Sequence, residues 1–118
     1  KPSPPQFDNG DYTFVVTLAS GLITSFTSNE SSIAPPATDE STFIIEATPA
    51  LRPTIQNRKN KYKLIQAVPT GGLIDITSPY NNVIPQSGLQ SGQSIYLRIS
   101  TVNKAGLRSD PVEVEVTL

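Results

Sequence analysis

Carboxylates are the main side chains of this sequence that could carry out acid–base chemistry, because histidine and cysteine are both absent. Their absence removes the commonest general base, a common nucleophile and the usual zinc ligands together. A pair of carboxylates can cleave a glycosidic bond only when it flanks a substrate cleft, and a chain this short leaves little room for one. We therefore expect a protein that is not an enzyme and that needs no cofactor.

Two aspartates in "DNGD" are the weak candidates for a metal site. Asp8 and Asp11 offer the hard oxygen ligands that calcium prefers. The twelve-residue ligand pattern of an EF-hand is missing, however. Aspartate and asparagine also stabilise turns, and that is the interpretation we favour. The acidic pair Asp39–Glu40 is interpreted in the same way, as part of a solvated loop.

Tyrosine rings are the second group of side chains that could bind a ligand, since sugar rings pack on exposed aromatic faces. The chain has no tryptophan, so Tyr62, Tyr80 and Tyr96 are the available platforms. Tyr80 lies in "SPYNN", where a turn would expose its ring. The alternative function is accordingly a carbohydrate-binding module in which Tyr62, Tyr80 and the Asn81–Asn82 loop contact a glycan. The competing interpretation is that these rings line the rim of a core.

Charge is distributed unevenly along the chain, although the net charge is only −1. From Pro2 to Ala50 every charged residue is acidic, and from Leu51 to Ile74 every charged residue is basic. One interpretation is that the two segments lie side by side and neutralise each other within one domain. The other is head-to-tail contact, in which the acidic end of one copy or domain meets the basic loop of the next. The candidate residues for a protein partner are Arg52, Arg58, Lys59, Lys61, Lys104 and Arg108.

Other partners are disfavoured by the same composition. A net charge near zero creates no field that attracts nucleic acid or an anionic membrane. The chain has no apolar run of about 18 residues and no charged-then-apolar leader, so we expect no membrane insertion and a mature or trimmed chain. "NES" at Asn29 matches the N-glycosylation acceptor pattern in an expected loop.

Alternating apolar residues predict that nearly all regular structure is β. Isoleucine, valine and threonine are abundant, and β-branched side chains suit a pleated surface. "YTFVVTLASGLITSF" predicts a hairpin that turns near Ala19 to Gly21, and "STFIIEATP" and "KYKLIQAV" predict two further strands. The clearest strands are about Ser94 to Val102 and Val112 to Leu118. Seven or more short strands with regular turn signals indicate an antiparallel β-sandwich, with a closed barrel as the alternative.

The remaining segments have weaker patterns. "LIDIT" predicts a short strand, "SPYNN" a turn, and "VIPQ" a short edge strand that Pro85 interrupts. The segment from Ala50 to Asn60 has no clear period and is expected to be a long loop. An edge pairing around Ile33 is compatible with the prolines that follow it. No helical period is evident.

The C-terminal part resembles a fibronectin type III domain. "LQSGQSIYLRISTVN" matches the entry into the penultimate strand of that family, and "VNKAGLRSDP" is similar to its passage into the last strand. The tyrosine that usually ties its hydroxyl to the backbone is replaced by Ile95, with Tyr96 one residue later. The usual tryptophan of the second strand is also missing, so an immunoglobulin-like sandwich is equally compatible. The resemblance implies that "STFIIEAT" and "KYKLIQAV" are the second and third strands.

The domain organisation follows from these boundaries. We expect a Pro-rich arm or linker at 1–6, an N-terminal strand or hairpin at 7–30 and a fibronectin type III-like sandwich at 31–118, with one continuous domain over 7–118 as the alternative. The N-terminal apolar run could fold on its own sandwich or add a strand to the sheet edge of a neighbour.

The expected function is that of a non-catalytic structural and interaction module in a surface-exposed assembly. Suitable settings are a secreted or cell-surface protein, a filament subunit or a phage virion component, with an extracellular, cell-surface or virion location. In the resembling family the loop "NKAGLRSD" sometimes contacts a receptor, which draws attention to Lys104 and Arg108. Fold analogy carries much of this expectation.

Overall fold

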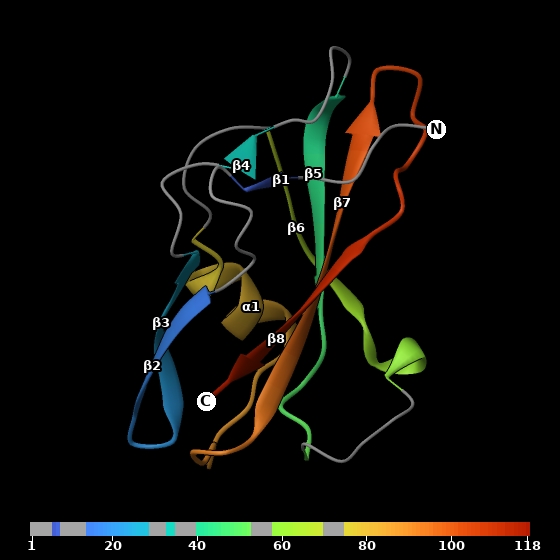
Figure 1. Cartoon of the computed structure of the whole chain (residues 1–118). Helices are drawn as coiled ribbons and strands as arrows, with labels where there is room; N and C mark the ends of the chain where they lie inside the picture. The colour runs from blue at the N-terminus through green and yellow to red at the C-terminus, as the bar shows by residue number, and fades with distance from the viewer. Residues whose placement is uncertain (1–5, 8–13, 29–32, 35–39, 53–57, 70–74) are drawn as a thin grey trace.

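The protein is an all-β antiparallel sandwich with one short helix, as seen in the computed structural model of the chain (Figure 1). The structure describes all residues except 1–5, 8–13, 29–32, 35–39, 53–57 and 70–74. The strands and helices are β1 (Gln6–Phe7), β2 (Phe14–Ala19), β3 (Leu22–Ser28), β4 (Ile33–Ala34), β5 (Glu40–Ala47), a 3-10 helix η1 (Lys59–Lys61), β6 (Lys63–Pro69), α1 (Thr77–Val83), β7 (Ser94–Asn103) and β8 (Val112–Thr117). The predicted sandwich is thereby confirmed.

One layer is a four-stranded sheet in the order β6-β5-β7-β8. Alternation along its last two strands determines which side chains enter the core. Ile95, Leu97 and Ile99 of β7 are buried, as are Val114 and Val116 of β8. Glu113 and Glu115, which alternate with the valines of β8, are exposed, because successive strand residues point to opposite faces. The last two strands and their inward faces are therefore as the sequence predicts.

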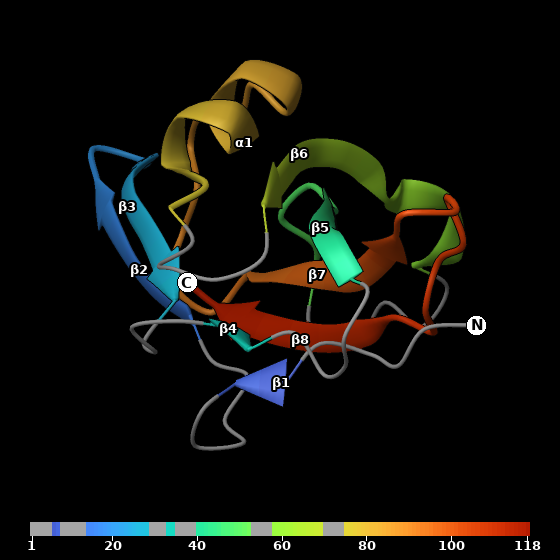
Figure 2. The same cartoon turned by 90° about the horizontal axis from the view of Figure 1, so that it is seen from above.

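The opposing layer is the β2–β3 hairpin, which folds on the core of its own chain (Figure 2). Ser20 and Gly21 form its two-residue turn, and both have positive φ, at 54° and 75°. Such turns match the natural twist of the flanking strands. The pairing shifts register after Thr17, with Thr24 as the extra residue on β3. The predicted hairpin is confirmed, and the apolar run occupies a core of its own chain, as in the first of the two interpretations.

Helix α1 occupies the place where the sequence predicts a turn and an edge strand, and those two predictions are wrong. Leu73 and Ile74 of the predicted short strand lie outside the described residues. Only Asp75 of "LIDIT" forms a β-bridge among the described residues, to Thr27. Pro79 signals a turn, but it lies in the first helical turn, where its missing N–H would have no partner in any case. Asp75 accepts a hydrogen bond from the Thr77 N–H at 3.1 Å and so satisfies one of the free donors there. The helix lies between β3 and β6 (Figure 2).

One hydrophobic core joins the two layers and the helix. Phe26 of the hairpin, Ile45 of the four-stranded sheet and Tyr80 of α1 are all less than 2% exposed and belong to the same cluster. The single O–H of Tyr80 has two acceptors within reach, the Thr48 carbonyl oxygen at 3.2 Å and Gln86 Oε1 at 3.3 Å. A tyrosine thus ties the helix to the backbone after β5. The core therefore includes residues of the N-terminal hairpin, which ends before residue 30, as well as residues of the strands that follow it.

The shorter elements connect these layers. β1 pairs antiparallel with β4, so Ile33 has an edge partner in Phe7, as the sequence allowed. Part of the expected loop after Ala50 is regular, because η1 precedes β6 and Leu51 continues the ladder to Ser94. The β7–β8 connection is a tight turn. Asn103 Oδ1 accepts hydrogen bonds from the Ala105 and Leu107 N–H groups at 3.0 Å, and Gly106 has a φ of 85°.

Candidate functional site

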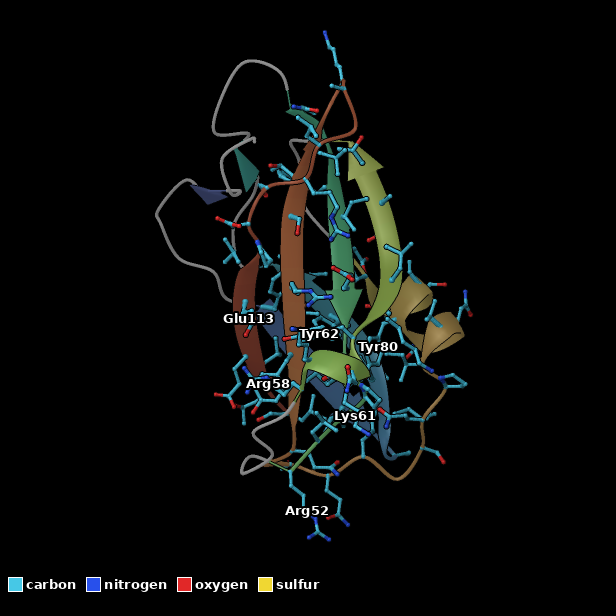
Figure 3. The ribbon with its side chains drawn as sticks, turned by 90° about the vertical axis from the view of Figure 1, so that its right-hand side faces the viewer. Arg52, Arg58, Lys61, Tyr62, Tyr80 and Glu113 are labelled. Carbon is cyan, nitrogen blue, oxygen red and sulfur yellow. The ribbon has the colours of Figure 1, made fainter. Side chains whose placement is uncertain are left out.

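The outer face of the four-stranded sheet gathers arginine, tyrosine and glutamate side chains from five segments of the chain (Figure 3). Strand register brings three of them into a row, since Arg98 of β7 lies opposite Glu46 of β5 on one side and Glu113 of β8 on the other. We call this surface the arginine–tyrosine face, and it consists of Glu46, Arg58, Tyr62, Tyr96, Arg98, Arg108, Glu113 and Glu115.

Glu46 is the ionic centre of the arginine–tyrosine face. Arg98 binds it in a bidentate manner, with Nε 3.1 Å from Oε1 and Nη2 2.9 Å from Oε2. Arg108 adds a third contact, 2.8 Å from its Nη2 to Oε1. Burial alone would raise the pKa of Glu46, but the hydrogen bonds and positive charges of Arg98 and Arg108 outweigh it and hold the pKa below its ordinary value. Glu46 is therefore a fixed carboxylate at neutral pH.

Two arginines stack on two tyrosines beside this centre. The Arg58 guanidinium lies 4.0 Å from the centre of the Tyr96 ring, and the Arg98 guanidinium lies 4.4 Å from that of Tyr62. Guanidinium groups in such positions are attracted by the electron-rich ring face. Arg58 also donates to Glu113 at 3.1 Å, while the Tyr96 hydroxyl donates to Glu115 at 2.9 Å. The stacks and ion pairs together hold both arginines in one orientation.

Two polar atoms in this layer are buried without a hydrogen-bonding partner of good geometry, namely Arg58 Nε and the Tyr62 hydroxyl. Burial raises the pKa of Tyr62, although the neighbouring Arg58 works in the opposite direction. The phenol is therefore neutral at physiological pH.

A group of exposed cations borders the arginine–tyrosine face. We call Arg52, Lys59, Lys61 and Lys63 the basic cluster. Within the described part of the chain none of them forms an ion pair, because the arginines that do are Arg58, Arg98 and Arg108. Figure 3 shows Arg52 and Lys61 in the same half of the molecule. All four side chains are exposed.

The expected neutralisation of the acidic segment 2–50 by the basic segment 51–74 is not seen at Glu46. Asp8, Asp11, Glu30 and Asp39 lie outside the described residues. Glu46, from the acidic segment, pairs with Arg98 and Arg108, both of which lie far later in the sequence. Arg58, from the basic segment, pairs with Glu113. The strand order explains this pairing. β5 is hydrogen-bonded to β7, so Arg98 of β7 lies beside the Glu46 carboxylate of β5.

The partner-binding candidates are thus divided among three places. Arg58 and Arg108 are held in intramolecular pairs on the arginine–tyrosine face, whereas Arg52, Lys59 and Lys61 belong to the basic cluster. Lys104 is exposed in the β7–β8 turn, at the opposite end of β7 from the segment that carries Arg52 (Figure 1). The structure does not bring Lys104 together with the basic cluster.

The residues predicted to stack on a glycan differ in how far the structure exposes them. Tyr80 is 1% exposed, so its predicted role as an exposed platform is wrong. The physical reason is that "SPYNN" is helical and directs Tyr80 into the core. Tyr62 remains partly exposed, but Arg98 covers one side of its ring. Asn81 donates to the Ile23 carbonyl at 3.3 Å and is used to hold α1 against β3.

The metal and modification candidates cannot be placed. Asp8, Asp11 and Asn29 lie outside the described residues. Within the part of the chain that is described, no group of three or more acidic side chains is arranged to hold a metal ion.

A shallow groove of about 500 Å³ runs between β3 and the segment that follows α1. Its lining is apolar or neutral, and it consists of Leu22, Ile23, Thr24, Asn81, Pro85, Gln86 and Ser87. It contains no charged side chain and no aromatic ring.

Sequence reasoning overlooked the residues at the centre of the face, namely Glu46, Arg98, Glu113 and Glu115. A signal was nevertheless present. Alternation in "YLR" and "VEVEV" places Tyr96, Arg98 and both glutamates on the side opposite the core. The missing information was that β5 is the other neighbour of β7.

Comparison with protein-family models gave no matching family, and comparison with curated proteins gave no matching relative. Among the described residues, the one α-helix is too short to cross a membrane.

Proposed function

We propose that the chain is a non-catalytic structural and interaction module of a surface-exposed assembly, which meets an acidic protein surface through its basic cluster. The observation that carries the proposal is the contrast between the two sets of cations. Those on the arginine–tyrosine face are held by glutamates, while those of the basic cluster are exposed and have no acidic partner in the described chain. Charges without partners at a surface favour the encounter with a complementary one.

The proposed setting is a secreted or cell-surface protein, a filament subunit or a phage virion component. The partner is a neighbouring domain or another copy, whose acidic N-terminal half would meet the basic cluster head to tail. Such a heterologous contact forms a closed ring or an open chain, depending on the rotation between successive copies.

The finer fold assignment is part of the same proposal. We infer a fibronectin type III-like or immunoglobulin-like module because the order β6-β5-β7-β8 corresponds to strands C′, C, F and G of immunoglobulin-like sandwiches, with β2 and β3 in the other layer. In that correspondence β5 is the third strand and not the second, since the hairpin supplies the first two. Helix α1 stands where such sandwiches have a further strand. The hydrogen bond from the Tyr80 hydroxyl to the Thr48 carbonyl is donated from this helix.

Sedimentation of the purified chain at low and high salt tests the head-to-tail contact. We expect the average mass to rise with protein concentration at low salt and to fall when salt is added, because exposed charges are screened beyond about 8 Å at physiological ionic strength. The triple variant Arg52→Gln/Lys59→Gln/Lys61→Gln should lose the salt-sensitive part of this association.

Lys104→Gln is the matched control, since it removes one exposed cation at the other end of the molecule. It should associate as the parent chain does. Equal loss of association in the triple variant and in Lys104→Gln would contradict a specific role for the basic cluster, and salt-independent association would contradict the electrostatic contact itself.

A further inference from the structure

The short helix η1 presents two cations of the basic cluster without any packing of its own. None of its three residues, all of which the structure describes, is buried. One backbone hydrogen bond closes its turn, from the Lys61 N–H to the Arg58 carbonyl oxygen at 2.9 Å. A single helical turn gains too little from one hydrogen bond to offset the loss of backbone freedom. The residues that flank η1 must therefore fix Lys59 and Lys61 on the molecule.

Arg58 and Tyr62 flank η1, at its N-cap and its C-cap, and each takes part in a stack with strand β7. The Arg58 guanidinium lies 4.0 Å from the centre of the Tyr96 ring, and its Nη2 lies 3.1 Å from Glu113 Oε2. At the other end, the Arg98 guanidinium lies 4.4 Å from the centre of the Tyr62 ring. Figure 3 shows Arg58 on the side of η1 nearest Glu113. Helix η1 is thus attached to the sheet at both ends, and we call Arg58, Tyr62, Tyr96 and Arg98 the η1 clamp.

The two residues of the η1 clamp that belong to β7 are held by further contacts. Tyr96 is 6% exposed, and its hydroxyl donates to Glu115 at 2.9 Å. Arg98 is fixed by its two hydrogen bonds to Glu46, a fork geometry that leaves the guanidinium little freedom to rotate. Both residues are therefore held independently of η1. The order of the sheet is in this way passed to the helix that carries the lysines.

We propose that the η1 clamp makes the basic cluster a pre-organised site for a carboxylate-rich peptide segment, with Arg58 and Tyr62 as positioning residues. The inference rests on the acidic partner proposed above and adds which residues order its site. Binding costs free energy for every side chain and loop that becomes ordered in the complex. Because the clamp orders η1 in the free chain, that cost is reduced for Lys59 and Lys61.

The chemistry of the site favours a peptide over a single-stranded nucleic acid. Bases of a single strand stack on exposed aromatic rings. Tyr96 is buried, and Arg98 covers one side of the Tyr62 ring, so neither tyrosine offers an open platform. Carboxylates require only positive charge and hydrogen-bond donors, which the exposed lysines supply. The ligand class is therefore an acidic peptide.

Two pairs of variants test the positioning role without a change of charge. Tyr96→Leu removes the ring on which Arg58 stacks and Tyr96→Phe keeps it, while Tyr62→Leu and Tyr62→Phe do the same at the other end of η1. A fluorescent oligoglutamate peptide at low salt is the probe. Each leucine variant should bind it about three- to tenfold more weakly than the parent chain. Each phenylalanine variant should bind as the parent chain does, because the stack with the guanidinium needs only the ring.

Backbone order in η1 is measured by NMR on the same variants. The order parameter S² at Lys59 and Lys61 should stay near about 0.85 in the parent chain and the phenylalanine variants, and should fall toward about 0.6 in the leucine variants. Tyr62 is partly exposed, so its pair of variants decides the question if Tyr96→Leu does not fold. Lys63→Gln is the matched control, since it removes a cation outside the η1 clamp. It should weaken binding without lowering the order of η1.

The outcomes distinguish this inference from the proposed function. Leucine variants that bind the peptide as tightly as the parent chain overturn the positioning role, even if the order of η1 falls, and leave the acidic partner standing. A parent chain that does not bind the peptide at low salt overturns both proposals. Binding that depends on the clamp in a chain that does not self-associate supports the inference and removes only the head-to-tail setting. Tighter binding of a single-stranded oligodeoxynucleotide of equal charge would overturn the ligand class.

Discussion

Replacement of Glu46 by glutamine should destabilise the protein through one identifiable set of contacts. Glutamine has nearly the same shape, so the packing is conserved while the charge is removed. Three charge-assisted hydrogen bonds are affected, two from Arg98 and one from Arg108. The Glu46 side chain is 14% exposed and that of Arg98 is 25% exposed, whereas that of Arg108 is 49% exposed.

Those exposures determine the expected magnitude. A hydrogen bond to a charged group contributes about 1.5–3 kcal/mol when it is shielded from water. A solvent-exposed ion pair such as that with Arg108 contributes about 0–1 kcal/mol. Glutamine keeps one oxygen, which can still accept the two bonds that end on Oε1, but it loses the charge and the bond from Arg98 Nη2. We therefore expect Glu46→Gln to lower the free energy of unfolding by about 2 kcal/mol at pH 7. Urea denaturation measures this difference.

The loss should depend on pH in a defined direction. The pKa of Glu46 is lowered in the folded state. Its contribution is therefore complete above the unfolded pKa, which is about 4.3, and is lost as pH falls through the lower folded pKa. Once Glu46 is protonated it is as neutral as glutamine. The difference in stability between the parent chain and Glu46→Gln should therefore shrink as the pH is lowered below about 4.

Glu113→Gln is the matched control, because its ion pair with Arg58 is more exposed, at 50% for the glutamate. It should cost less than about 1 kcal/mol. Double-mutant cycles should also give a larger coupling of Glu46 with Arg98 than with Arg108. The reasoning is refuted if the two glutamine variants lose equal stability at pH 7, or if the loss at Glu46 is unchanged in acid.

Two further pairs of variants each compare a residue in a packed environment with a residue in an open one. Tyr80→Phe removes the hydroxyl that binds the buried Thr48 carbonyl and should cost about 1–2 kcal/mol in urea denaturation, whereas Tyr96→Phe, whose hydroxyl contacts the exposed Glu115, should cost less than about 1 kcal/mol. Equal losses would argue against the backbone tie. Gly21→Ala should lower the melting temperature more than Gly106→Ala does. Both glycines have positive φ, but a Cβ at Gly21 would lie 3.0 Å from the Gly88 nitrogen while one at Gly106 meets nothing within 4 Å. A smaller effect at Gly21 would mean that the hairpin turn can move away from the segment around Gly88.

Local alternation accounts for the parts of the fold that could be predicted. The hairpin and the last two strands have apolar residues at every second position, and the buried residues of β7 and β8 are the expected ones. Helix α1 was missed because it is shorter than two turns and is held by one buried ring, so it has too few residues to show a helical period. Pro79 added a misleading turn signal.

The sequence identified some residues of the candidate site but not the residues that they contact. Arg58, Tyr62 and Arg108 were identified as exposed basic or aromatic residues, and the structure places all three on the arginine–tyrosine face. Their partners could not be identified in advance, because no local pattern specifies that β5 and β7 are neighbours.

The amino-acid sequence by itself determined the all-β character of the protein, its hairpin and the inward faces of its last strands. These features depend on residues two positions apart, whose side chains share one face of a strand. The tertiary structure alone decided that Tyr80 is buried and that Glu46 pairs with Arg98 and Arg108. Each of these depends on which distant segments become neighbours, and that is set by packing around the shared core.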